Sequence, residues 1–174
     1  MRTVQREKRV IMFEPQDLDA SQTLENLWIN LSNYQHASIH IVTGVIGGAF
    51  SVSLDQATDQ SGTGTKTLPF ETTTAHGAVL DIADNSDATA ANRDKFTKTA
   101  VVSDTFTVGA TDDQKHYMIE IDSSVLDRDG GFSWVNVDLT DPGAATYVCI
   151  IAELKESNFA GSEDDSDAFP SALS

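Results

Sequence analysis

Four histidines and one cysteine are the side chains of this sequence best suited to hold a metal ion or attack a substrate. His36 and His40 are four residues apart, a spacing that brings two ligands together only on a helix. The alternating pattern from Ile39 predicts a strand instead, where four residues span about 13 Å. We therefore interpret both as surface histidines. His76 and His116 have no Cys or His near them in the sequence, and no spacing favours a site assembled across strands.

Cys149 lies within an apolar run, residues 147–151. A single cysteine leaves no intrachain disulfide, and a nucleophile would need an opening and a base beside it. We predict that Cys149 is a small buried hydrophobic residue.

Two polar loops resemble ligand-binding motifs only in part. Residues 62–67 have a lysine after two glycines, but Thr65 stands where a phosphate loop needs glycine, and no helix follows. Residues 127–130 lack the third carboxylate and the later glutamate of a calcium loop. We interpret the second loop as a turn with an acidic rim. No nucleophile elbow is present, so we predict no catalytic residue, no metal ligand, no cofactor and no enzyme.

Trp28 and Trp134 could stack on a sugar ring. Trp134 has the parity of Asn136 and Asp138 and so belongs to a polar strand face. An exposed tryptophan there suits a glycan platform or a subunit contact, and simple partial burial explains it equally well. All three interpretations stay open.

The elements that must position these residues are strands. Apolar residues alternate with polar ones around residues 38–41, 50–55, 105–108, 116–122 and 135–139. This period of two is typical of half-buried antiparallel strands, and no stretch shows a sustained helical stripe. The sequence predicts an all-β protein, a jelly-roll-like antiparallel β-sandwich of about eight strands.

Glycine and proline mark the breaks between these strands. Gly47-Gly48 predicts a hairpin that joins the strands at Ile39 and Phe50, and residues 141–143 predict a turn. A short helical turn is expected at residues 123–127. Residues 145–154 are apolar on both parities almost throughout, which predicts a central strand covered on both sides, in one version by a neighbouring subunit.

Charge is distributed unevenly along the chain. It has 27 acidic and 11 basic residues, a net charge of −16. The first nine residues hold four basic and one acidic side chain, which makes them +3 and the remainder −19. Such a body repels nucleic acids and anionic membranes, so we expect neither as a partner. The acidity either serves solubility or has a specific reason, such as an external position on a large assembly or a salty habitat.

We divide the chain into a basic arm (residues 1–9), a β-sandwich domain (residues 10–155) and an acidic tail (residues 156–174). The basic side chains of the arm are Arg2, Arg6, Lys8 and Arg9. The arm is either a disordered end or a peg that docks onto an acidic neighbour. No signal peptide or membrane span is recognisable, so we expect synthesis in the cytoplasm without export.

Several stretches together resemble a known group of proteins. They are residues 31–37, 43–48, 50–59, 66–70, 117–122, 126–127, 131–132 and 141–144. The pattern covers roughly residues 23 to 160 and resembles small virion proteins of tailed bacteriophages, usually encoded close to the major capsid protein. The resemblance implies a head decoration, cement or minor capsid protein without catalytic residues.

Two functional hypotheses follow. In the first, the chain is a virion structural protein on the outer capsid surface, which oligomerises, as a trimer, and binds the major capsid protein through its basic arm or Trp134. The alternative is a glycan-binding adhesin of a tail or fibre, which would use Trp28 and Trp134.

Overall fold

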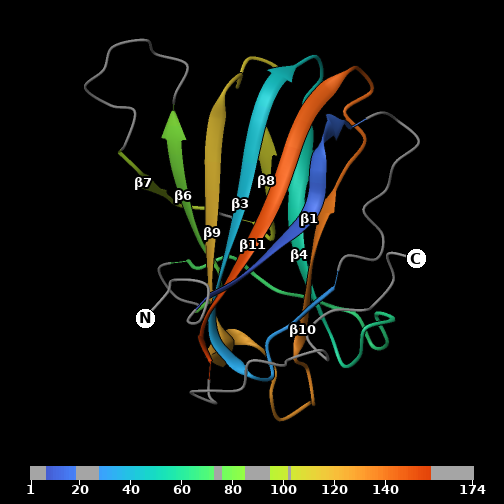
Figure 1. The fold of residues 1–174 in the computed structure, drawn as a ribbon, viewed down its shortest axis with the longest axis vertical. Coiled ribbons are helices and arrows are strands. Elements are labelled where there is room, and N and C mark those ends of the chain that lie inside the picture. The colour runs from blue at the N-terminus through green and yellow to red at the C-terminus, as the bar shows by residue number, and fades with distance from the viewer. Residues whose placement is uncertain (1–6, 19–27, 73–75, 85–94, 102, 158–174) are drawn as a thin grey trace.

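The computed structural model describes residues 7–18, 28–72, 76–84, 95–101 and 103–157 of the chain. Two antiparallel sheets pack face to face as a β-sandwich (Figure 1). Sheet A has the order β1 (Glu7–Asp17), β11 (Thr146–Ser157), β3 (Tyr34–Ile46), β9 (Lys115–Asp122), β6 (Val79–Asp84) and β7 (Thr97–Thr99). Sheet B has the order β2 (Ile29–Asn30), β10 (Trp134–Leu139), β4 (Phe50–Ala57) and β5 (Lys66–Thr67), with β8 (Thr105–Val108) also pairing with β4.

This architecture confirms the predicted all-β sandwich. Eight of the described strands have four or more residues, which agrees with the expected number. The other three, β2, β5 and β7, are two or three residues long, too short to leave an alternating pattern in the sequence. The more specific jelly-roll assignment stays a prediction.

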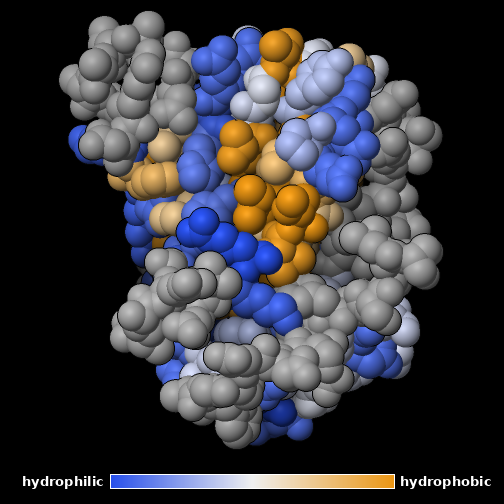
Figure 2. Space-filling model, viewed as in Figure 1, coloured by the Kyte–Doolittle hydropathy of each residue, from blue (hydrophilic) through white to orange (hydrophobic). Residues whose placement is uncertain are grey.

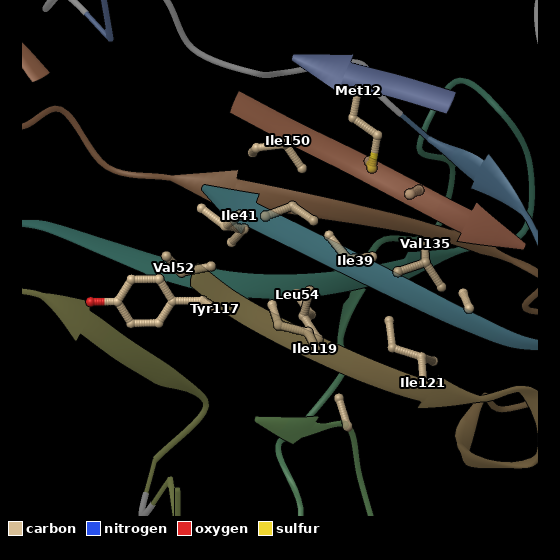
Figure 3. Packing of buried hydrophobic residues seen from close by; sticks show 14 of the residues in the cluster. Met12, Ile39, Ile41, Val52, Leu54, Tyr117, Ile119, Ile121, Val135 and Ile150 are labelled. Carbon is tan, nitrogen blue, oxygen red and sulfur yellow. The ribbon is translucent and has the colours of Figure 1, made fainter. Parts of the chain in front are cut away.

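The core lies between the two sheets (Figure 3). Ile39 and Ile41 of β3 meet Val52 and Leu54 of β4 there, and all four are fully buried. Their intervening neighbours point outward, as the period of two requires. Burying an Ile or Leu side chain contributes about 1.5–3 kcal/mol, so this alternation is what drives the two sheets together.

The first strand begins earlier than the predicted domain boundary. β1 starts at Glu7, so Lys8 and Arg9 of the expected arm pair with Leu154 and Glu153 of β11. Because β1 is an edge strand, the backbone groups of residues 7–9 that face β11 are paired by the sheet. At the other end, β11 continues to Ser157, so the strand passes the predicted boundary at residue 155.

The prediction of a hairpin at Gly47-Gly48 is wrong. β3 belongs to sheet A and β4 to sheet B, so this turn carries the chain from one layer to the other. The N–H of Gly47 donates to the carbonyl of Ala145, and a Cβ at Gly48 would lie 1.9 Å from the carbonyl oxygen of Pro142. Glycine is required here because a second turn passes so close.

That second turn, at residues 141–143, is confirmed, and it also crosses between the sheets. The helical turn is confirmed as a short 3-10 helix, Ser123–Val125, capped by the side chain of Asp122. No helix in the described parts of the chain is long and apolar enough to cross a membrane.

Candidate functional site

The outer face of sheet A carries an apolar strip. Its members are Ile11, Val42, Tyr147, Cys149 and Ile151. Ile11 is 62% exposed, Tyr147 52% and Val42 41%, while Cys149 and Ile151 are partly exposed. Figure 2 shows hydrophobic side chains gathered in the middle of this face, surrounded by hydrophilic ones.

Strand register assembles the strip. Ile11 of β1 lies opposite Ile151 of β11, and Cys149 of β11 lies opposite Val42 of β3. Residues that face each other across antiparallel strands point to the same side of the sheet. Three strands that are distant in the sequence therefore contribute to one surface.

The strip corrects two predictions about residues 145–154. Coverage on both sides by this chain is wrong, because β11 buries only its inner residues, such as Val148 and Ile150, and leaves Tyr147 exposed. Coverage by a neighbouring subunit stays a prediction. Cys149 was expected to be buried and is instead partly exposed on the strip, although burial still raises the pKa of its thiol. The apolar outer parity of β11 has no covering layer among the described residues.

Charged side chains form one border of the strip. Nε of Arg9 lies 2.7 Å from Oε1 of Glu153, and Nζ of Lys155 lies 3.5 Å from Oε2 of the same carboxylate. Lys155 also donates to Oγ of Ser38 (2.8 Å), which in turn donates to Glu120 (2.8 Å). Ser38 is fully buried, so its hydroxyl joins β3 to β9 and β11 and is not presented to a substrate.

A pair of histidines lies beside the strip. Nδ1 of His40 is 2.9 Å from Nε2 of His116, and Phe96 packs its ring edge-on against His116. Burial lowers the pKa of His40 despite the opposing attraction of Glu153, and burial together with His40 lowers the pKa of His116. His116 therefore does have a histidine neighbour, contrary to the impression from the sequence, because the register of β3 and β9 brings the two together.

The predicted partner contacts are dispersed. Arg2 and Arg6 lie outside the described residues. Lys8 and Arg9 are both in β1, but only Arg9 lies on the outer face with the strip, because Lys8 is opposite the buried Leu154. Trp134 is on the outer face of the other sheet. The structure therefore does not bring Trp134 together with the basic residues.

The two tryptophans of the glycan hypothesis differ in exposure. Trp28 is buried and packs against Gly62, which fits a structural role. Trp134 is partly exposed, and on the same face of β10 lies Asn136, a buried residue whose Oδ1 has no hydrogen-bond partner in the described parts of the chain. Asp55 lies opposite Asn136, and burial together with Asp138 raises its pKa.

The two loops that resemble ligand-binding motifs contact each other. Nζ of Lys66 lies 2.8 Å from Oδ2 of Asp127, and Oδ1 of Asp127 accepts the N–H of Gly130. Both carboxylate oxygens are thus engaged within the protein. Among the described residues, no group of three or more His, Cys, Asp or Glu side chains is arranged to hold a metal ion.

Sequence reasoning missed the apolar strip and the histidine pair. A signal for the strip existed, because residues 147–151 are apolar on both parities, and coverage by a neighbouring subunit already implies an apolar outer face. No local sequence pattern predicts the histidine pair, since it depends on the pairing of two strands.

No protein-family model matches this chain, and neither does any curated protein or solved structure. The resemblance to phage virion proteins accordingly stays a proposal.

Proposed function

We propose that this chain is a structural component of a tailed-phage virion, a decoration or cement protein that binds the outside of the head. It docks through the outer face of sheet A from β1 to β9, which we call the docking face. The exposed apolar strip is the observation that carries this proposal. Exposed apolar residues gathered on one face are typical of protein–protein contacts.

The strip is the part of this face where a partner meets least charge. The chain as a whole has a net charge of −16, so approach elsewhere brings a partner against carboxylates. β11 has 12 residues, so the face is about 40 Å long and, over four strands, about 15–19 Å wide. An area on the order of 600 Å² approaches the roughly 800 Å² that each partner buries in a specific complex.

We take the partner to be the major capsid protein, and its contact surface to be apolar in the centre with an acidic margin. Arg9 borders the strip with a side chain that is 64% exposed. Arg2 and Arg6 belong to the six residues that join β1 at Glu7, so they are tethered to the same edge. Opposite charges around an apolar centre fix the register of a complex and speed association.

The same proposal has copies of the chain associate, as a trimer, and bridge neighbouring capsid subunits. A position outside the shell keeps this acidic protein away from packaged DNA, whose phosphates would repel it. The proposed location is the outer capsid surface of the virion.

The test is the copy number and position of the chain in purified particles. We expect hundreds of copies in fixed ratio to the major capsid protein, with the docking face against the shell in an electron cryo-microscopy map. Tyr147→Ser and Ile11→Gln should abolish attachment while the fold is retained, because both side chains are already largely in water.

Thr107→Gln is the matched control, since Thr107 is exposed on the outer face of sheet B. It should attach as the unmodified chain does. A handful of copies at one vertex, or full attachment of the strip variants, contradicts the proposal.

A second candidate is a glycan-binding adhesin centred on Trp134. Its support is the partly exposed indole of Trp134 on the outer face of sheet B, since a sugar ring can stack on an aromatic face. A Trp134→Ala variant should lose glycan binding and keep its fold. A glycan array without any signal for the unmodified protein rejects this candidate.

A further inference from the structure

The histidine pair is continuous with the apolar strip. His40 of β3 lies opposite Ile151 of β11, and His116 of β9 lies opposite Val42 of β3. All four side chains belong to the outer face of sheet A, so a partner that covers the strip also covers the two imidazoles.

The geometry of the pair requires an uncharged ring. The two facing nitrogens are 2.9 Å apart, with ring centroids separated by 5.1 Å. In an N–H···N hydrogen bond one ring donates and the other offers a bare nitrogen, so at least one ring is neutral. One extra proton can be shared in this contact, whereas a second places hydrogens on both facing nitrogens and removes the acceptor.

The surroundings of Nε2 of His40 indicate in which order the two rings take up protons. Nε2 is buried, has no hydrogen-bond partner among the described residues, and lies 3.7 Å from Oε2 of Glu153. A first proton on His40 would be attracted by Glu153, and the second would then fall on His116 against a charged neighbour. Two such groups titrate as a unit, in two separate steps.

The charged groups around the pair come from every neighbouring strand. On the outer face they are Arg9 of β1, Glu153 and Lys155 of β11, His36 of β3, Glu120 of β9 and Asp81 of β6. Glu153 and Glu120 attract protons to His40, while Lys155 opposes them and burial outweighs the attraction. Cys149 contributes a neutral thiol, because burial raises its pKa.

We propose that the histidine pair makes docking acid-sensitive: the docking face binds while the two rings share a hydrogen bond, and it releases when acid charges both rings and separates them. This inference rests on the proposed function for its partner. The inference requires only that the partner present an apolar surface that excludes water from the two imidazoles.

The direction of the pH effect depends on whether the free or the docked chain binds protons more strongly. A docked partner removes water from the imidazoles, and this disfavours their charged forms further. Protons then bind more strongly to the free chain, so docking weakens as the pH falls through the lowered pKa values of the free pair, below the ordinary histidine value of about 6.5, by up to about tenfold per pH unit for each proton taken up on release.

The experiment measures co-sedimentation of the purified chain with capsid shells that lack it, at pH 7.5, 6.5 and 5.5. The unmodified chain should bind at pH 7.5 and lose affinity by up to about tenfold per proton and pH unit once the pH falls below the lowered pKa values of the free pair. His116→Gln should lose most of this pH dependence, measured as the ratio of its own affinities at pH 7.5 and 5.5, because the amide can still donate to His40 and cannot be charged. His76→Gln, at an exposed histidine elsewhere, is the control and should behave as the unmodified chain.

Circular dichroism at each pH checks that the variants are folded, and His40→Gln serves as the second variant. Imidazole ¹⁵N spectra of the free chain should show one neutral hydrogen-bonded pair at pH 7.5 that titrates in two steps. Equal pH dependence in His116→Gln and the unmodified chain overturns the inference, as do two rings that titrate independently. Absence of docking at pH 7.5 overturns the proposed function instead, and the release with it.

Discussion

Nδ1 of His40 lies 2.9 Å from Nε2 of His116, although 76 residues separate the two in the chain. The antiparallel register of β3 and β9 produces this contact, since His40 lies opposite Met118 and Val42 opposite His116. The two histidines are therefore diagonal neighbours on one face of the sheet.

Acid should destabilise the folded chain through this pair. Burial lowers the pKa of both imidazoles in the folded protein, so the contribution is fully present above the unfolded pKa of about 6.5 and is lost as the pH falls below it. Urea unfolding at pH 7.5, 6.5 and 5.5 should show a falling free energy of unfolding. The loss should be smaller in His116→Gln, and an equal loss in both proteins would refute this assignment.

Ile39→Ala should lower the free energy of unfolding by about 2–5 kcal/mol, because Ile39 is fully buried between the sheets and its removal leaves a cavity. Ile11→Ala is the matched control, since it removes the same atoms from a side chain that is 62% exposed. Its effect should stay within about 0.5 kcal/mol. Similar losses from both variants would mean that Ile11 is buried in solution, for example against a second copy.

Gly48→Ala should destabilise the fold by about 1–3 kcal/mol, because the new Cβ would meet the carbonyl oxygen of Pro142 at 1.9 Å and push apart the two turns that cross between the sheets. Ala49→Ser changes the next, exposed residue and should have little effect. Thermal unfolding of both variants measures the difference, and an unchanged Gly48→Ala protein would show that the turns do not pack in this way.

Cys149 should react slowly with iodoacetamide at pH 8, since burial raises its pKa and the thiolate is the reactive form. We expect a lower rate than for N-acetylcysteine, and the rate of the free thiol once the chain is unfolded in urea. Mass spectrometry gives a clean readout because the chain has one cysteine. Docking should slow the reaction further, and an alkylation rate that does not change on docking places the partner elsewhere.

Deletion of residues 1–6 should weaken capsid attachment in a salt-dependent way without lowering stability, because it removes Arg2 and Arg6 and leaves β1 intact. Deletion of residues 1–9 should also lower stability, since it removes three strand residues and the Arg9–Glu153 ion pair. Attachment assays at low and high salt, with unfolding curves, separate the two effects. Unchanged occupancy after the shorter deletion would show that the arm plays no part in docking.

Most of the strands could be assigned from the local alternation of apolar and polar residues. In β4, Phe50, Val52 and Leu54 alternate with Ser51 and Ser53, and this alternation alone places one face in the core. The sequence pattern did not predict all of β1. Bulges around Phe13 bury Met12 and Phe13 next to each other and so interrupt the period of two.

Sheet membership and register were decided only by tertiary structure. Gly47-Gly48 looks the same in the sequence whether the following strand returns to the same sheet or crosses to the other. The feature that distinguishes the two cases is the close contact between Gly48 and the turn at residues 141–143. That turn lies about a hundred residues away in the sequence, so the contact exists only in the folded protein.

The sequence by itself determined that this protein is an acidic β-sandwich, because side-chain alternation and charge are properties of single stretches of chain. Tertiary structure decided which outward residues meet. The pairing of β1, β11, β3 and β9 gathers Ile11, Val42 and Ile151 into one strip and sets the histidine pair beside it. Long-range hydrogen-bond ladders between strands fix that arrangement, and no single strand encodes its partner.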